Sequence, residues 1–391
     1  MNIYYGDFHI HVGRTMSGRP VKITGARSLT IESILDYAAN KKGLDMVGVI
    51  DCHVPEVIEE LRLLFQKGEL AELPEGGLRY KDGTVLIPGS EIEINDEHCK
   101  GPVHVLAFFS NLAQMELFSN WFSERVKNIT LSSQRIYERG TVLQEKVKEL
   151  GGLFIPAHIF TPHKSMFGKG VHQSLTEIFR PELIDAVELG LSADTAMASH
   201  LSELDAYPFL TNSDAHSLPK LAREYQQLLL EKPSFDEWVK ALRGEDGRRI
   251  VANYGLNPYL GKYHETVCEN CGETLEAYQA RCPYCGSTQV TKGVAERIQE
   301  LSDRDGEEAA VNRPPYIHHI PLEFLPGLGP KTLDKLITCF GSEMAVIHEA
   351  AFEELSEVVP EKIARLIQQA REGRLALQKG GGGIYGKVIH E

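Results

Sequence analysis

The stretch that decides the fold is Asp7-Phe8-His9-Ile10-His11-Val12, an alternation of polar and apolar residues near the start of the chain. Alternation with a period of two predicts a β-strand, and it places His9 and His11 on the same side of that strand. Two imidazoles on one side can chelate a metal ion. The stretch therefore predicts a strand that carries part of a metal site.

Outward from this strand, short β-like apolar runs alternate with helix-period segments as far as about Val251. The expected strands are 3–12, 46–51, 85–94, 103–109, 153–157, 184–189 and 209–212. Segments 33–41, 55–65, 134–150 and 236–243 carry apolar residues at helical spacing between them. This alternation predicts a parallel sheet, and about seven strand and helix units are enough to close a barrel.

Metal-type residues recur at the ends of the expected strands. Beyond Asp7, His9 and His11, they are Asp51, His53, Glu91, His104, His158, Asp214 and His216. Strand ends in such a barrel point to one face, so residues distant in sequence converge there. Any single histidine could instead be a core or surface residue bonded to the backbone, but the repeated pairs at strand ends favour metal binding.

Imidazole with carboxylate suits Zn, Mn or Fe rather than Ca, and a carboxylate such as Glu91 is what a multinuclear site needs as a bridge. Two or three closely spaced cations can activate a water and stabilise both the attacking and the leaving oxygen of a phosphoester. The sequence therefore indicates metal-assisted phosphoester hydrolysis.

These motifs resemble those of the PHP (polymerase and histidinol phosphatase) superfamily, whose members are phosphoesterases on a distorted seven-unit barrel. The residues that carry the resemblance are His9-Ile10-His11, Asp51-Cys52-His53, Gly89-Ser90-Glu91, His104, His158 and Asp214-Ala215-His216. The resemblance implies two or three divalent metals (Zn, Mn, Mg or Fe) and catalysis by His9, Glu91 and Asp214.

By this resemblance, the first ion would be held by His9, His11, Glu91 and Asp214. A second would be held by Glu91, His104 and His158, and a third would take His53 and His216. Arg14 and Thr15 stand where many members have a further ligand for the third ion.

Four of the 7 cysteines form two Cys-x-x-Cys pairs, Cys268 with Cys271 and Cys282 with Cys285. Each pair presents two sulfurs to one tetrahedral ion, which predicts a structural zinc ribbon in a reducing compartment. Redox pairing is the competing interpretation. The ribbon either braces its neighbours or contacts nucleic acid.

The segment from Leu322 to Leu336 reads as a short apolar helix, a Gly-x-Gly hairpin at Gly327 and Gly329, and a second helix. Glycines let the backbone approach a ligand closely, and amides at the following helix start suit a phosphate, with Lys331 beside them. The segment resembles the helix-hairpin-helix motif of DNA repair proteins. An ordinary helical hairpin is the alternative.

This order divides the chain into a barrel (1–255), a zinc-binding ribbon (256–300), an all-α helix-hairpin-helix domain (313–378) and a flexible tail (379–391). The fold class is α/β, a distorted (β/α)7 PHP-type barrel followed by the two smaller modules. The N-terminus lacks the pattern of a signal peptide and no run is long enough to span a membrane, so we expect a cytoplasmic protein with no membrane partner.

The formal net charge of -14 argues against a nucleic-acid partner. The formal charge, however, omits bound metal ions, and local positive patches matter more for binding DNA than the sum over the chain. Two loops at the expected metal face, 13–28 and 160–173, have cations and no carboxylates. We expect them to contact DNA through Arg14, Arg19, Lys164, Phe167 and Lys169, with Phe167 holding a flipped base.

Barrel, four-cysteine ribbon and helix-hairpin-helix in this order resemble the endonuclease Q family. The resemblance implies an enzyme that nicks DNA on the 5′ side of a deaminated base (uracil, hypoxanthine or xanthine) or of an abasic site. A PHP phosphatase acting on a small phosphomonoester is the alternative enzyme. A non-catalytic DNA-binding subunit is disfavoured by the complete ligand set.

Overall fold

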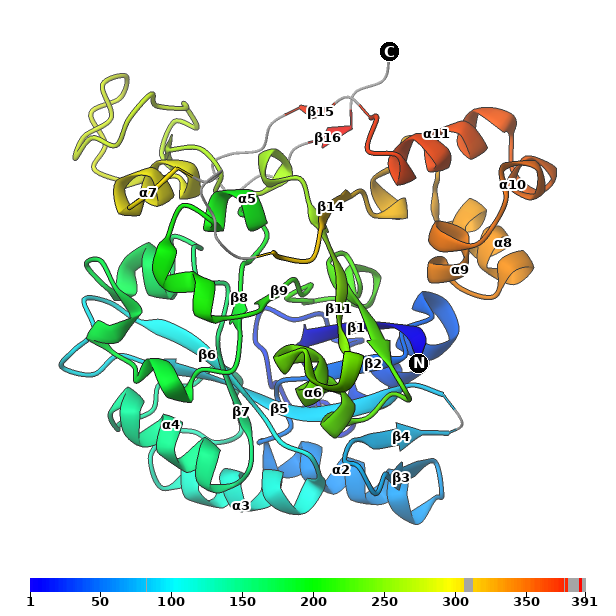
Figure 1. Cartoon of the computed structure of the whole chain (residues 1–391), viewed down its shortest axis with the longest axis horizontal. Coiled ribbons are helices and arrows are strands. Elements are labelled where there is room, and N and C mark those ends of the chain that lie inside the picture. The colour runs from blue at the N-terminus through cyan, green and yellow to red at the C-terminus, as the bar shows by residue number, and fades with distance from the viewer. Residues whose placement is uncertain (82, 306–311, 376, 379–386, 389–391) are drawn as a thin grey trace.

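The computed structural model describes residues 1–81, 83–305, 312–375, 377–378 and 387–388. Its centre is a barrel of seven strands (Figure 1). In order around the barrel they are β1 (Asn2–Ile10), β2 (Met46–Val49), β5 (Val85–Ile94), β6 (Val103–Phe108), β7 (Leu153–Pro156), β8 (Val187–Glu188) and β9 (Phe209–Leu210). The ring closes where Ala215, five residues after β9, exchanges backbone hydrogen bonds with His9 of β1 and with His11 directly after that strand. The expected seven-unit barrel is confirmed.

The sheet is mixed, so the prediction of a parallel sheet is wrong for part of it. β1, β2 and β5 are parallel, whereas β6 runs antiparallel to both β5 and β7. Only residues 95–102 connect β5 to β6. A parallel crossover needs a dozen or more residues, so a connection of this length makes a hairpin.

Strands outside the barrel widen the sheet on both sides of it. β10 (Tyr225–Leu230) and β11 (Arg249–Leu256) extend it antiparallel from β1. β3 (Leu70–Glu72) and β4 (Leu78–Tyr80) extend it from β5. None of these four strands was among those predicted from the apolar runs.

Helices cover the barrel where apolar residues recur at helical spacing. They are α1 (Ile31–Tyr37), α2 (Pro55–Gln66), α3 (Leu112–Ser123), α4 (Gly140–Glu149), the short α5 (Thr195–Ala198) and α6 (Phe235–Arg243). Helix α6 begins at Ser234, whose side chain accepts from the Glu237 amide, and ends at Gly244 with φ 67°. Its Trp238 ring stacks on Phe8 of β1 with 3.9 Å between ring centroids, which fixes the helix against the sheet.

The ribbon follows the barrel and contains β12 (Val267–Cys268), β13 (Val290–Thr291) and helix α7 (Val294–Leu301). The chain then returns to the sheet as β14 (Tyr316–His319), which pairs parallel with β11. This strand falls inside the range predicted for the helical domain, yet it belongs to the main sheet.

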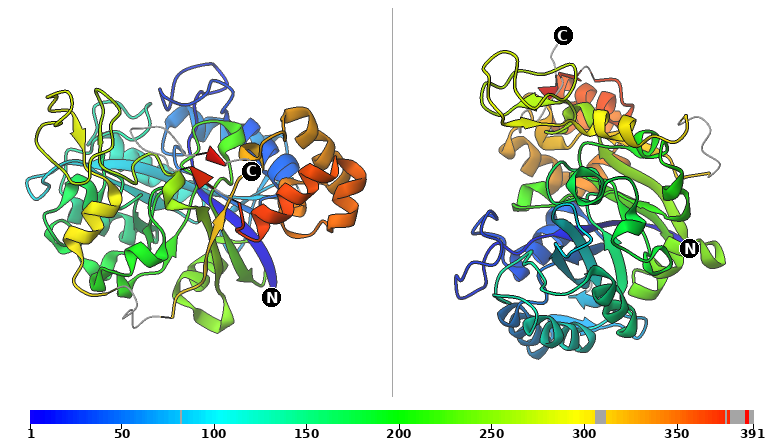
Figure 2. Two further views of the ribbon diagram at one scale, coloured as in Figure 1. Left: turned by 90° about the horizontal axis from the view of Figure 1, so that it is seen from above. Right: turned by 90° about the vertical axis from the view of Figure 1, so that its left-hand side faces the viewer.

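Four α-helices follow β14 in the described chain: α8 (Pro330–Phe340), α9 (Glu343–His348), α10 (Phe352–Val358) and α11 (Glu361–Arg371). They lie at the same end of the barrel as the ribbon, but on the opposite side of the molecule (Figure 2). Lys42 of the barrel forms a buried ion pair with Glu343 of α9, with 2.8 Å between Nζ and Oε2. The helical part is thus fixed to the barrel rather than tethered.

The predicted flexible tail lies mostly outside the described residues. Of 379–391 only β16 (Lys387–Val388) is described, and it pairs antiparallel with β15 (Leu377–Gln378). Within the described part of the chain, no helix has the length and hydropathy needed to cross a membrane.

Candidate active site

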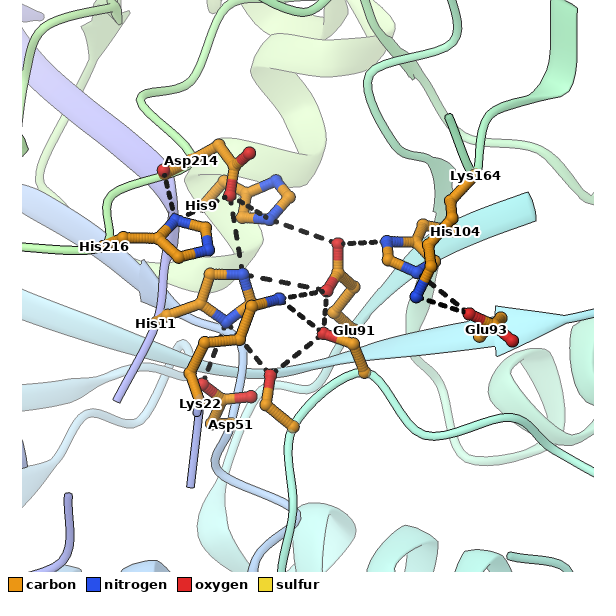
Figure 3. A network of polar contacts seen from close by, with 12 residues as sticks. His9, His11, Lys22, Asp51, Glu91, Glu93, His104, Lys164, Asp214 and His216 are labelled. Carbon is orange, nitrogen blue, oxygen red and sulfur yellow. Dashed lines mark hydrogen bonds and ion pairs between the residues drawn. The ribbon is translucent and has the colours of Figure 1, made fainter. Parts of the chain in front are cut away.

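The barrel brings six of the predicted ligands together at one edge, and Figure 3 labels five of them, all except His158. They are His9 on β1, His11 directly after it, Glu91 on β5, His104 on β6, His158 after β7 and Asp214 after β9. His104 lies near the start of its strand rather than its end. Because β6 is antiparallel to β5, with His104 opposite Glu93, its amino end meets the carboxyl end of β5.

The first group consists of His9, His11 and Asp214. Nε2 of each histidine lies 3.5 Å from Oδ1 of Asp214. All three ligand atoms are buried and have no hydrogen-bond partner among the described residues. Buried polar atoms are almost always paired, so three convergent unpaired atoms fit a bound cation.

The second group consists of Glu91, His104 and His158. Oε1 of Glu91 lies 2.8 Å from Nδ1 of His104 and 3.4 Å from Nε2 of His158. The same oxygen lies 3.5 Å from Nε2 of His9. The Glu91 carboxylate therefore stands between the two groups, where a carboxylate that bridges two cations would stand.

Histidines surround two carboxylates of the site and keep them ionised. Burial acts to raise the pKa of Asp214, but the imidazoles of His9, His11 and His216 outweigh it and hold that pKa well below its usual range. Burial likewise acts to raise the pKa of Glu91, and the neighbouring His104 and the Lys22 ammonium outweigh it. Both groups are in the anionic form that a divalent cation binds.

Two further carboxylates orient the histidines of β1. Glu188 of β8 accepts from Nδ1 of His9 at 3.0 Å, and Asp51 accepts from Nδ1 of His11 at 3.0 Å. Each bond turns Nε2 toward the ligand group, which is the usual role of a carboxylate behind a ligating histidine. Asp51 was a predicted ligand and instead lies outside both groups. Sequence reasoning missed Glu188, a buried acid inside an apolar run.

Asp7 also lies outside the two groups because it is deeper in β1. Its carboxylate accepts from the backbone amides of Ser213 at 3.0 Å and Ala222 at 2.9 Å. Arg223 donates from Nη2 to the carbonyl of Asp214 at 3.1 Å. Asp7 and Arg223 thus hold the turn that presents Asp214, and no sequence motif indicated this role for Arg223.

The two ligands that follow strand ends have uncommon backbone conformations. His158 and Asp214 have φ values of 30° and 45°, in the left-handed region that non-glycine residues rarely adopt. Such conformations cluster at functional sites, where the surrounding structure maintains them. Each of these two residues places a ligand atom in one of the two groups.

The histidines predicted for a third ion belong to neither group within the described residues. Nδ1 of His53 lies 2.9 Å from the Ser90 hydroxyl, and the ring is buried. His216 lies closer to the site, with Nδ1 3.5 Å from Oδ1 of Asp214. Burial lowers the pKa of His216 to about 4, so this imidazole is neutral and able to bind a cation at neutral pH.

Lysines approach the site from the two cationic loops. Nζ of Lys22 lies 3.2 Å from Oε2 of Glu91 and donates to Ser133 at 2.7 Å. Nζ of Lys164 pairs with Oε2 of Glu93 at 2.8 Å (Figure 3). Lys164 was predicted to contact DNA, and here its charge is matched by a carboxylate.

The other residues predicted to contact DNA differ in exposure and in what surrounds them. Arg19 is 77% exposed and lies 3.7 Å from Glu56, while Arg14 donates to the Gly13 carbonyl. Lys169 lines a cavity of about 270 Å³ between its loop and the ribbon. Phe167 is fully buried and stacks on Phe160, so the prediction that it holds a base is wrong. An aromatic residue on a polar loop and one in a core look alike in sequence.

A larger cavity of about 590 Å³ opens beside the first ligand group. His158, Asp214 and His216 form one wall, and Thr24 and Tyr263 are among the residues that line the rest. Tyr263 comes from the segment that leads into the ribbon. The cavity is wide enough for one nucleotide-sized group next to the ligands.

The four ribbon cysteines converge as their spacing predicted. Sγ of Cys268 lies 3.6 Å from Sγ of Cys285, and Sγ of Cys271 lies 3.7 Å from that of Cys282. A tetrahedral zinc with bonds of about 2.3 Å separates its sulfurs by about 3.8 Å, whereas a disulfide bond is about 2.05 Å long. The cluster is therefore arranged for a metal ion.

The glycine hairpin of the helical part has an open surface. Gly327 has φ 82°, and a Cβ built on Gly329 would meet nothing within 4 Å. Gly329 caps the start of α8, and Lys331 in its first turn is exposed. Helices α10 and α11 form a second helical pair, joined by a Val359-Pro360 turn that has no glycine.

A barrel with two histidine and carboxylate groups at one edge, joined to a four-cysteine cluster and helical hairpins, is the arrangement expected of a metal-binding phosphoesterase. No family model matches the chain. It is 59% identical over 388 residues to uncharacterized protein YqxK of Bacillus subtilis, across 99% of this chain and 100% of that one.

Two solved structures cover the chain almost completely. The lesion-specific endonuclease PfuEndoQ from Pyrococcus furiosus is 31% identical with a TM-score of 0.84, covering 99% of this chain and 95% of that one. Endonuclease Q in complex with a 27-mer duplex substrate, with an abasic lesion at its active site, is 31% identical with a TM-score of 0.85, covering 100% and 97%. The chain belongs to the endonuclease Q family and is a hydrolase of DNA phosphodiester bonds.

Proposed function

We propose that this enzyme cuts DNA on the 5′ side of a deaminated base (uracil, hypoxanthine or xanthine) or of an abasic site. The observation that carries the proposal is the pair of ligand groups joined at Glu91 beside a nucleotide-sized cavity. The related complex, in which an abasic lesion of a duplex lies at the active site, supports a DNA lesion as the occupant.

Two divalent cations, Zn, Mn, Mg or Fe, would be held by His9, His11 and Asp214 and by Glu91, His104 and His158. Such cations activate a water and stabilise the attacking and leaving oxygens of a phosphodiester. The ribbon cysteines would hold a structural zinc.

The protein's own groups prepare the site for this chemistry. Glu188 and Asp51 keep the two β1 histidines in one tautomer, with Nε2 available as a ligand atom. Asp7 and Arg223 fix the turn of Asp214. The ligands are thus held in place before a substrate binds, which lowers the cost of reorganisation during the reaction.

The cavity next to Asp214 would receive the damaged nucleotide after it leaves the base stack. Tyr263 is the aromatic side chain of the cavity lining and would stack on a base. An abasic site has no base to hold and costs less to unstack, which agrees with its place among the proposed substrates.

The duplex on either side would be held by phosphate contacts. The exposed Arg19, the ribbon cavity at Lys169 and the amides around Gly329 offer such contacts. A reducing cytoplasmic compartment agrees with the seven cysteines, none of which forms a disulfide among the described residues.

The test is incubation of the purified protein with duplexes that carry a single uracil, hypoxanthine or abasic site, in the presence of Mg or Mn. Nicking of these duplexes and not of undamaged DNA is expected. Phosphate release from a histidinol-phosphate-like monoester with no nicking would support the phosphatase alternative and contradict the proposal.

A further inference from the structure

A β-turn formed by residues 22–25 projects an isoleucine into solvent next to the ligand groups. The Gly25 amide donates to the Lys22 carbonyl at 2.9 Å, so Ile23 and Thr24 occupy the central positions of the turn. Ile23 is 70% exposed, more than any other large hydrophobic residue of the described chain. Burial does not explain an isoleucine at this position.

Both ends of this turn are fixed to the active site. Nζ of Lys22 lies 3.2 Å from Oε2 of Glu91, and the Ala26 amide donates to the His216 carbonyl at 2.8 Å. A Cβ on Gly13 would meet the Ala26 carbonyl oxygen at 2.0 Å, so the two arms of the loop are in close contact. The tip is therefore a rigid projection rather than a free loop.

The turn also borders the large cavity. Thr24 lines it together with His158 and Asp214, and Ile23 is the next residue outward. Single exposed apolar residues are common on protein surfaces and need no explanation. What distinguishes Ile23 is that a rigid turn holds it at the rim of the cavity, beside the ligands.

We propose that Ile23 is a wedge that enters the base stack of the duplex and occupies the space that the damaged nucleotide leaves. This inference rests on the proposed function, since it presupposes a lesion in duplex DNA. Apolar wedges unstack base steps in other DNA-binding proteins. A β-branched side chain has few rotamers, so its insertion costs little side-chain entropy.

The wedge helps to open the duplex. Its loss should therefore lower the cleavage rate only where the bases of the DNA are stacked. Ile23→Ala is expected to slow single-turnover cleavage of a uracil in a fully paired duplex by about tenfold or more. The same uracil in an unpaired bubble is expected to be cut within about twofold of the wild-type rate, because its base needs no unstacking. Ile23→Leu keeps the apolar volume and is expected to restore most of the duplex activity.

Leu117→Ala on α3 is the matched control, since Leu117 is an apolar residue with 57% exposure that lines no part of the cavity. Equal rates of the wild type and Ile23→Ala on paired duplex, or equal slowing on duplex and bubble, would overturn the proposal.

A second readout is independent of cleavage. In an Asp214→Asn background, 2-aminopurine placed next to the lesion should brighten on binding, and Ile23→Ala should abolish most of that rise. A wild type that leaves all damaged DNA intact would refute the proposed function, whereas an unchanged fluorescence rise in Ile23→Ala would refute the wedge alone.

Discussion

At the scale of single residues, the site depends on side chains behind the ligands as much as on the ligands. Glu188 contacts Nδ1 of His9 with both carboxylate oxygens at 3.0 Å, and it is 1% exposed. Its negative charge makes the His9 imidazole a stronger metal ligand and fixes the tautomer of that ring. The first ligand group is therefore sensitive to a residue that binds no cation itself.

We predict that Glu188→Gln weakens binding of Mn²⁺ to the barrel by about 10- to 100-fold while the fold persists. Titration of the metal-free protein with Mn²⁺, followed by calorimetry, measures the change. Glu182→Gln, an exposed acid of the same segment, serves as the control. An unchanged affinity in Glu188→Gln would show that the His9 contact has no effect on the metal site.

The ligand residues could be predicted because polar residues alternate with apolar ones at the ends of the strands. This pattern is visible within a few neighbouring residues of the sequence. Glu188 could not, because one acid in an apolar strand looks like a tolerated surface position until its partner, 179 residues away, is known. Phe167 was assigned wrongly for the related reason that sequence does not show whether a loop folds back into the core.

At the scale of elements, the positions of the barrel strands were predicted, but the direction of β6 was not. Apolar runs fix where a strand lies, whereas direction depends on the connection. The short 95–102 link between β5 and β6 was the available signal, and it is too short for a crossover. β10, β11 and β14 were missed because their pairing joins distant segments.

The ribbon is an element that cannot bury a core of its own, so its fold depends on the metal. Replacing Cys268 and Cys271 with serine should release about one zinc per chain, because two thiolates cannot complete a tetrahedral structural site. Elemental analysis counts the zinc, and limited proteolysis detects loosening of residues 264–300. Cys339→Ser, an exposed cysteine outside the cluster, is the control. Full zinc retention would show that the four sulfurs do not form the site.

The glycine hairpin should add affinity without specificity. Gly329→Val places a branched side chain in open space at the start of α8, so the fold should tolerate it while close approach of a phosphate is blocked. We expect binding of damaged and undamaged duplex to weaken equally, by about tenfold.

Fluorescence anisotropy with both duplexes measures the effect of the hairpin change. Gly83→Val is a suitable control, since a Cβ there would meet a single carbonyl oxygen at 4.0 Å. Normal binding of all DNA with lost preference for damage would place recognition in the hairpin and contradict this assignment.

At the scale of the whole molecule, the helical part and the main sheet meet at two histidines, the buried His319 and the partly buried His348. His348 of α9 stacks on Tyr5 and accepts from the Tyr225 hydroxyl through Nε2 at 2.8 Å. Burial lowers the pKa of His348 to about 4 and that of His319 to about 3. Both imidazoles are neutral in the folded protein at neutral pH.

This interface should make the protein acid-sensitive. The unfolded chain protonates these histidines near pH 6.5, so it binds more protons than the folded chain below that pH, and stability falls as the pH drops from 6.5 toward 4. His348 contributes up to about 3 kcal/mol of this loss. Urea unfolding at pH 7 and pH 5 should show a smaller pH effect in His348→Gln than in the wild type, with the exposed His98→Gln as control. Equal pH effects in all three proteins would contradict the buried neutral state.

The net charge of -14 describes the whole chain, and taken alone it argues wrongly against a DNA substrate. Several of the acids are ligands or orienting groups of the barrel, where cations would offset them. Exposed cations lie instead on loops near the ligand groups, such as Arg19. Local charge, not the sum, agrees with a DNA substrate.

The most direct measurement is the position of the cut in a 5′-labelled strand that carries one uracil, with the wild type compared with Asp214→Asn. We predict one metal-dependent product that ends immediately 5′ to the uracil. Asp214→Asn should lower its rate by about a thousandfold, because a charged ligand of the first group is lost, while DNA binding persists. Asp236→Asn, on the exposed side of α6, should cut normally. Cutting at other positions, or wild-type turnover by Asp214→Asn, would contradict the account.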